Sequence, residues 1–259
     1  MEKILGFLFV SIFLIGCGSN ETPEVIKDSV DAPDESREAE AQQMVVEYLW
    51  NTEGPDYSEG GLQELVADWN NRIDAGNYEM LGANLLRPQF ETDFGDLVWV
   101  LLWPSQSARD AGWAQWNANE NADWQNETKD FLQDSSEHMY AFNVKSGFQA
   151  DGFELEVGES FIPNFYFCDL LEGKSQNDFD SYLAKYEADF ATEEDSTEYG
   201  YAILEAKFPL ENDAVWLDYF GSEVDMEVGS ANWTGSESES AWNDLVACET
   251  RQFAGTVIR

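Results

Sequence analysis

An internal repeat constrains this chain more than any other feature of its sequence. Apolar and aromatic residues at helical spacing occur between residues 62 and 73, and the pattern returns 117 positions later. The first set is Leu62, Leu65, Val66, Trp69 and Ile73, and the second is Phe179, Tyr182, Leu183, Tyr186 and Phe190. The same offset relates the hydrophobic segments 96–99 and 213–216, and the regions that follow them. Three elements at a nearly constant offset indicate a duplicated unit.

Both copies predict the same order of elements. In the first copy we expect strands at 45–50, 78–86, 97–103 and 138–145, and helices at 60–74 and 105–132. In the second copy we expect strands at 164–171, 199–208, 214–220 and 246–253, and helices at 176–190 and 222–245. Pro104 and Gly221 end the third strands. Two βαββαβ units predict an α+β fold made of tandem ferredoxin-like units.

This organisation resembles the dimeric α/β-barrel superfamily, which includes NIPSNAP-like proteins and small monooxygenases. The resemblance rests on tandem units with tryptophan-rich third strands and second helices, covers about residues 43–257, and includes no diagnostic active-site motif. In that superfamily two sheets pack face to face, usually between two chains. The resemblance implies a pseudo-dimeric α/β barrel that closes within one chain, and therefore allows a monomer. Repeat 1 would cover 43–146, a connector 147–162 and repeat 2 163–259.

Two cysteines allow a local prediction. Cys168 lies on the expected first strand of the second unit, and Cys248 lies on its fourth strand. These strands are antiparallel neighbours in a ferredoxin-like sheet, and facing positions on such strands bring Cα atoms within disulfide range. We therefore expect a structural disulfide. The alternative is a pair of buried free thiols.

The N-terminus has the features of an export signal. The apolar run from Ile4 to Ile15 is shorter than the roughly 20 residues that span a bilayer, and it fits the hydrophobic part of a signal peptide. Leu14-Ile15-Gly16-Cys17 resembles a bacterial lipobox. The resemblance implies that the signal peptide is 1–16, that Cys17 is lipidated, and that the protein is anchored in the cell envelope, with the outer membrane favoured. An ordinary signal peptide with an incidental cysteine is the alternative.

Charge and composition limit the classes of partner and ligand that we expect. Residues 17–42 are acidic, contain two prolines and no aromatic residue, and predict a flexible tether. The chain has 52 acidic and 13 basic residues, a formal net charge of −39, which disfavours binding to nucleic acid. One histidine and three cysteines do not suggest a zinc site. We expect no metal and no cofactor.

Alternation along the third strands suggests a ligand site. Trp99, Leu101 and Trp103 share one face of the first, and Trp216, Asp218 and Phe220 share one face of the second. We expect these faces to line the space between the two sheets, where Trp99, Trp103, Trp216 and Phe220 would contact a ligand. The opposite faces, which carry Val98, Val100, Leu102, Val215, Leu217 and Tyr219, would pack under the helices.

Three residues are candidate acid or base groups. In an aromatic interior, desolvation would raise the pKa of Asp218. The alternatives are a solvated strand end or reversed faces. Tyr219 follows it, and His138 is the only imidazole in the sequence. His138 could be a proton shuttle or a haem ligand, although a polar loop histidine is commoner.

The second helices carry five tryptophans and a glycine repeated in both copies. We expect Trp113, Trp116, Trp124, Trp233 and Trp242 to belong to the core. The alternative is that some of them line a cleft for an apolar or aromatic ligand. Because glycine weakens a helix, Gly112 and Gly229 indicate a close helix–sheet approach or a kink.

Three functions remain open at this point. The favoured one is a non-catalytic envelope lipoprotein that binds a small apolar or aromatic molecule or a partner protein, because the expected interior has no convergent titratable groups. The second is a cofactor-independent oxygenase, isomerase or lyase that uses Asp218, Tyr219 or His138; it rests on the superfamily resemblance alone. The third is a structural envelope protein without a ligand.

Overall fold

The computed structural model describes residues 43–190 and 197–259. The first half contains β1 (Val45–Glu53), α2 (Glu59–Gly76), β2 (Gly82–Pro88), β3 (Leu97–Trp103), α3 (Gln106–Asn119), α4 (Asn121–Thr128) and β4 (Leu132–Gln149). The second half contains β5 (Ser160–Leu170), α5 (Gln176–Phe190), β6 (Tyr199–Ala206), β7 (Ala214–Phe220), α6 (Glu223–Trp233), α7 (Glu237–Asn243) and β8 (Val246–Val257). Cys17, the expected signal peptide and the expected tether lie outside the described residues.

The strands form one closed antiparallel barrel, in the order β1-β3-β2-β8-β5-β7-β6-β4. Each half contributes four neighbouring strands in the same internal order, β4-β1-β3-β2 and β8-β5-β7-β6. Two seams join the halves, one between β2 and β8 and the other between β4 and β6. The expected α+β fold and the closure of a barrel within one chain are therefore confirmed, and closure leaves no free sheet edge.

Both halves fill the barrel interior. Tyr48 of β1 packs edge-to-face on Phe142 of its own half at 5.7 Å and on Phe165 of the other half at 5.4 Å between ring centroids. Val215 and Phe253 from the second half are buried in the same cluster. Burial of each large apolar side chain contributes roughly 1.5–3 kcal/mol, so separation of the two halves would destabilise both.

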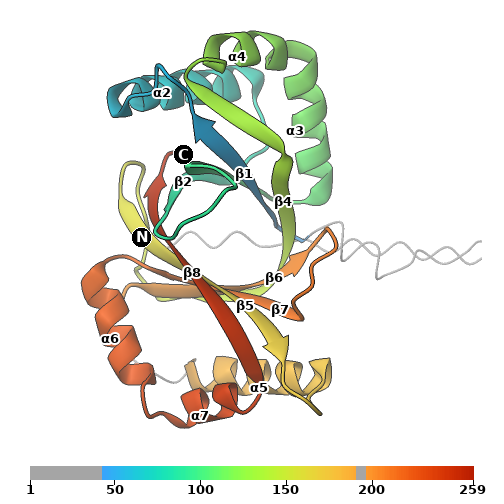
Figure 1. The fold of residues 1–259 in the computed structure, drawn as a ribbon, viewed down its shortest axis with the longest axis vertical. Coiled ribbons are helices and arrows are strands. Elements are labelled where there is room, and N and C mark those ends of the chain that lie inside the picture. Colours follow the sequence, from blue (N-terminus) through green and yellow to red (C-terminus); the bar gives the residue numbers. More distant parts are fainter. Residues whose placement is uncertain (1–42, 191–196) are drawn as a thin grey trace, which may run out of the picture. The chain divides into compact units, whose positions relative to one another are not determined.

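The helices cover the outside of the barrel in two groups. Figure 1 shows α2, α3 and α4 on one side of the barrel, and α5, α6 and α7 on the opposite side. A separate hydrophobic cluster lies between each helical group and the strands beneath it. Within the described ranges, no helix is both long enough and apolar enough to cross a bilayer.

The expected orientation of the third strands is wrong. Trp99 and Trp103 pack beneath the helices of the first half, and Trp216 packs beneath those of the second. The opposite faces, which carry Val98, Val100, Leu102, Val215, Leu217 and Tyr219, line the barrel interior. Strand alternation identifies the residues that share a face but not the direction of that face, and here both faces are buried.

Several element boundaries also differ from expectation. Each second helix is two helices, with a break at Glu120 in the first half and at Gly235 in the second. Gly235 has φ of +81°, a conformation that glycine adopts readily. β4 begins at Leu132 and runs to Gln149, with a register shift between Val144 and Ser146, and it pairs with both β1 and β6. This long strand forms one of the seams.

The predicted disulfide is confirmed. Cys168 of β5 faces Cys248 of β8 across an antiparallel pair, and their Cα atoms are 4.0 Å apart. The bond joins the first and fourth strands of the second half, and Cys168 is fully buried. It fixes the base of the second helical layer.

The repeated glycines mark a close helix–strand approach, as the sequence indicates. A Cβ atom on Gly112 would lie 2.5 Å from the Trp103 ring, whereas one on Gly229 would lie 3.0 Å from the Phe220 ring. Trp103 is almost completely buried and cannot move aside. The constraint is therefore stricter in the first half.

Replacement of each glycine by alanine tests this difference. We expect Gly112→Ala to lower the free energy of unfolding by about 1–2 kcal/mol, because overpacking against Trp103 exceeds the gain in helix propensity. Gly229→Ala should be neutral or stabilise by up to about 1 kcal/mol. Urea denaturation of both variants measures the difference, and equal effects would contradict it.

Candidate functional site

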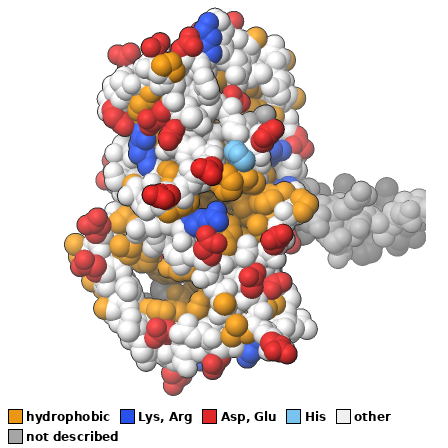
Figure 2. Space-filling model, in the orientation of Figure 1, with side chains coloured by type: hydrophobic (Ala, Val, Ile, Leu, Met, Phe, Trp, Pro, Cys, Tyr) orange, Lys and Arg blue, Asp and Glu red, His pale blue; other side chains and the backbone are white. Residues whose placement is uncertain are grey.

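Two cavities occupy equivalent places in the two halves, each between the helical layer and the outer face of the strands. The cavity in the first half has a volume of about 90 Å³, whereas that in the second half has about 1120 Å³ and is partly open to the surface. Figure 2 shows an opening in the lower part of the view, with hydrophobic side chains along its edge. Only the second cavity is large enough for a typical small-molecule ligand.

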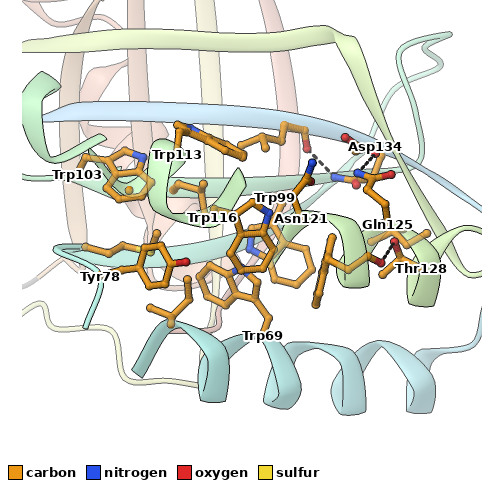
Figure 3. A pocket seen from close by; sticks show the side chains of 18 residues that line it. Trp69, Tyr78, Trp99, Trp103, Trp113, Trp116, Asn121, Gln125, Thr128 and Asp134 are labelled. Atoms are coloured by element: carbon orange, nitrogen blue, oxygen red, sulfur yellow. Dashed lines mark hydrogen bonds between the residues drawn. The ribbon is translucent and has the colours of Figure 1, made fainter. Parts of the chain in front are cut away.

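Aromatic rings fill most of the space in the first half. Trp99 packs on Trp69 at 5.2 Å and on Trp124 at 6.1 Å between ring centroids, and Trp116 packs on Trp124 at 5.6 Å. Figure 3 shows Trp69, Trp99 and Trp116 close together between α2 and the sheet. Little free volume remains.

A buried ion pair completes the packing of the first half. Glu47 of β1 is fully buried, and its Oε1 accepts a 3.0 Å hydrogen bond from the Nε of Arg109 and a further bond from the same guanidinium. Its Oε2 accepts a 2.7 Å hydrogen bond from the indole Nε1–H of Trp113. Arg109 and Trp113 both come from α3, so the pair joins this helix to the sheet.

The second half lacks all three of these groups. Glu47 lies opposite Leu101 in the sheet, and the equivalent position opposite Asp218 is Asn164. Helices α3 and α6 both begin after a capping serine, so Arg109 corresponds to Met226 and Trp113 corresponds to Ser230.

Asn164 contacts Met226 as Glu47 contacts Arg109, with its Nδ2 3.5 Å from the methionine sulfur. The loss of an arginine and a tryptophan from the helix leaves the larger cavity. The Oδ1 of Asn164 is buried there without a hydrogen-bond partner.

Helices α6 and α7 over the larger cavity are poorly packed, whereas α5 buries Phe179, Leu183 and Tyr186. Helix α3 buries Ala108, Gly112 and Trp116, whereas neither α6 nor α7 has a buried residue. Trp233, the counterpart of Trp116, is only partly buried and lines the cavity. The second helical layer therefore lies over space that its own side chains do not fill.

Asp218 of β7 lies in the wall of this cavity. Its Oδ1 accepts hydrogen bonds from the Tyr199 hydroxyl and the Trp216 Nε1–H, both at 2.7 Å. Burial raises the pKa of Asp218 from 3.8 to about 6, and hydrogen bonds from Tyr199, Trp216 and Tyr166 lower the pKa only in part. No salt bridge reaches Asp218 among the described residues. A carboxyl group of this kind can accept a proton or a hydrogen bond from a ligand.

The structure does not bring the three candidate catalytic residues together. Asp218 faces the helices, whereas Tyr219 points to the barrel interior with its hydroxyl 3.2 Å from the carbonyl oxygen of Phe148. His138 lies on β4 in the first half, 4.8 Å from the ring of Phe94 and 3.2 Å from the hydroxyl of Tyr140. His138 and Tyr219 line neither of the two cavities.

The four candidate ligand-binding aromatics do line cavities, although not between the sheets. Trp99 and Trp103 line the smaller cavity, and Trp216 and Phe220 line the larger one. Sequence reasoning missed the tyrosines of the larger cavity, which include Tyr166 and Tyr199. The available signal was the repeat itself, because its offset of 117 exposes the changes from Arg109 to Met226 and from Trp113 to Ser230.

The larger cavity does not suit a haem group. No histidine lines it, so it offers no imidazole ligand. Burial raises the pKa of Tyr166, Tyr186 and Tyr199, which disfavours the phenolate form that ligates haem iron. No lysine or arginine among its described lining residues faces the cavity to pair with haem carboxylates. No cluster of three metal-ligating side chains occurs among the described residues either.

Exchange of residues between the halves tests the role of the ion pair. We expect Arg109→Met to lower the free energy of unfolding by roughly 3–5 kcal/mol, because it leaves the Glu47 carboxylate buried without a cation. The double variant Glu47→Asn/Arg109→Met copies the second half and should lose less. Urea denaturation measures both, and a double variant less stable than Arg109→Met would contradict this account.

The pKa of Asp218 predicts a pH-dependent stability difference. Because its pKa is raised in the folded state, its contribution to stability is present below about pH 4 and is lost as the pH rises through about 6. Asp218→Asn should therefore gain stability relative to the unmodified protein between pH 4 and pH 7, by up to roughly 3 kcal/mol. Denaturation at stepped pH gives this difference. A difference that stays constant with pH would refute the assignment.

Comparison with known proteins identifies the fold. No protein-family model matches the sequence, and no curated protein matches it significantly. A proposed monooxygenase from Fusobacterium nucleatum superposes with a TM-score of 0.53 and 11% identity over 84% of this chain and 93% of that chain. A proposed chlorite dismutase gives 0.52 and 9% over 84% and 95%. The chlorite dismutase of Candidatus Nitrospira defluvii, in complex with imidazole, gives 0.50 and 9% over 87% and 96%. The chain therefore has the fold of the dimeric α/β-barrel proteins.

Proposed function

We propose that the second half of this protein binds a small molecule with an aromatic or apolar body in the cavity between β5–β7 and helices α5–α7. The observation that carries the proposal is the contrast between the halves. The same helical layer encloses about 90 Å³ in the first half and about 1120 Å³ in the second. A ligand in the larger cavity would fill the space that the side chains of α6 and α7 leave open.

The lining of the cavity supports this proposal. Nine aromatic side chains with large apolar surfaces line it: Phe148, Tyr166, Tyr182, Tyr186, Tyr199, Trp216, Phe220, Trp233 and Trp242. Covering apolar surface is worth about 25 cal/mol per Å², so a ligand that touches several of these rings has a substantial driving force. Asp218 and Asn164 supply polar contacts, and few such groups are typical of ligand pockets.

A second candidate function is proton transfer on the bound molecule. The raised pKa of Asp218, about 6, is the observation that favours it, because such a group can exchange a proton near neutral pH. The test is exchange of ligand C–H protons in D₂O once the ligand is known. Exchange that depends on Asp218 supports catalysis, and its absence leaves binding as the function.

We also infer that the chain is a duplicated ferredoxin-like unit carried on a lipid-anchored, exported protein. The strand order β4-β1-β3-β2, repeated as β8-β5-β7-β6, supports the first part. The Leu14–Cys17 segment supports the second. On this proposal the acyl groups on Cys17 hold the binding domain at the cell envelope, with the outer membrane favoured.

A tryptophan placed in the cavity tests binding. Ser230→Trp restores the ring that Trp113 provides in the first half, and it should remove any molecule that co-purifies with the protein from the cells that make it. Val224→Trp is the matched control, because Val224 lies on the same helix but is 67% exposed and does not line the cavity. Native mass spectrometry detects the bound molecule.

The outcome for the control decides the interpretation. Loss of the molecule in Ser230→Trp with retention in Val224→Trp supports the cavity as the site. Equal retention in both variants would rule out binding there.

Replacement of the candidate lipidation residue tests export and anchoring. We expect Cys17→Ser to move the protein from the membrane fraction to the soluble fraction, because it removes the attachment point for acyl chains. Immunoblots of fractionated cells measure the distribution. Unchanged membrane association would exclude lipidation as the anchor.

A further inference from the structure

The two halves differ in how they compensate a carboxylate between the helices and the sheet, which is fully buried in the first half and partly buried in the second. In the first half the Arg109 guanidinium pairs with Glu47 inside the protein. In the second half the residue equivalent to Glu47 is Asn164 on β5. The acidic residue there is Asp218, which lies opposite Asn164 on the neighbouring strand β7. The helix residue that corresponds to Arg109 is Met226, and no cation pairs with Asp218 in the part of the chain that the structure describes.

Hydrogen bonds from uncharged side chains use only part of the acceptor capacity of the Asp218 carboxylate. The bonds from Tyr199 and Trp216 both reach Oδ1. A carboxylate can accept about four hydrogen bonds, so capacity remains on the side of the cavity. A positively charged group that entered the cavity would complete this set and would compensate the charge.

The rest of the lining also favours a cation. Asp151 and Glu227 are acidic, and no lysine, arginine or histidine lines the described wall. The rings of Tyr166, Trp216 and Trp233 present aromatic faces or edges within the same space, and aromatic faces attract cations. The net charge of −39 attracts cations over longer distances at low salt. An anionic ligand would meet repulsion from the carboxylates and from the net negative charge.

We propose that the cavity binds an organic cation, a molecule with an ammonium or guanidinium group on an aromatic or apolar body, with the cationic group at Asp218. The ligand would then supply to the second half the charge that Arg109 supplies to the first, and its body would fill the volume that Trp113 occupies there. This inference rests on the proposed binding function, and it adds the chemical class of the ligand.

Three matched probes test the ligand class. The probes are 4-phenylbenzylamine, which is a cation at neutral pH, its neutral analogue 4-phenylbenzyl alcohol, and the anion 4-phenylbenzoate. Isothermal titration calorimetry at pH 7.5 in 0.15 M salt gives the affinities. We expect the amine to bind at least ten-fold more tightly than the alcohol, and the benzoate to bind more weakly than either.

Two variants assign the preference to Asp218. Asp218→Asn should weaken amine binding at least ten-fold and change alcohol binding by no more than about two-fold. Met226→Arg, which supplies an internal cation as in the first half, should also weaken amine binding at least ten-fold and serves if Asp218→Asn does not fold. The control Val224→Arg adds the same charge on the exposed face of α6 and should leave amine binding unchanged.

The outcomes separate this inference from the binding function. Equal binding of amine and alcohol that Ser230→Trp abolishes would overturn the cationic class and retain the cavity as a binding site. Tighter binding of the benzoate would also overturn it. Absence of binding by all three probes would overturn the inference, and native mass spectrometry of the Ser230→Trp protein would then decide the binding function separately.

Discussion

Closure of the barrel within one chain is the constraint on which the rest of the structure depends. The two seams join strands of different halves, and the interior between them is filled by side chains of both. Tyr48 and Phe165 belong to different halves and pack directly on each other. Each half therefore stabilises the other through its inner face. The outer face of each half is free of this requirement.

This division explains how two halves with the same strand order can differ so much on their outer faces. In the first half Glu47, Arg109 and Trp113 join α3 to the sheet and leave little space. A buried ion pair of this kind adds little net stability compared with an apolar core, but removal of one partner is costly. The second half lacks all three groups, so no unpaired carboxylate occupies the position equivalent to Glu47. Asn164 and Met226 occupy its place, and the disulfide between Cys168 and Cys248 holds the strands beneath.

The fold could be predicted from the sequence because its main signals are periodic. The repeat gave the order of elements, and the order predicted that Cys168 and Cys248 would face each other across two adjacent strands. The sequence did not reveal which face of each third strand is covered by helices. Both faces are apolar, and alternation identifies only the residues that share a face. The tryptophans of the third strands therefore belong to the helical layers, whereas Trp50 of β1 lies in the barrel interior.

The site was only partly predictable for the same reason. Asp218 stood out as a carboxylate among aromatic residues, and the structure places it in a cavity wall. The tyrosines that surround it come from separate strands and a helix, and only the tertiary structure brings Tyr166, Tyr186 and Tyr199 together. The most informative sequence signal was a difference between the copies. Ser230 stands at the position equivalent to Trp113, so the second half has no large side chain there, and this difference marks the half that contains the larger cavity.

Hydrogen–deuterium exchange of the ligand-free protein tests the central claim most directly, because it compares the two helical layers within one molecule. Helix α3 packs on the sheet through buried side chains, whereas α6 has none. The account predicts that amides of α6 exchange much faster than those of α3 in the empty protein, and that they become protected when the cavity is filled. Equal protection of α3 and α6 in the empty protein would contradict the claim that the second layer is incomplete without a ligand.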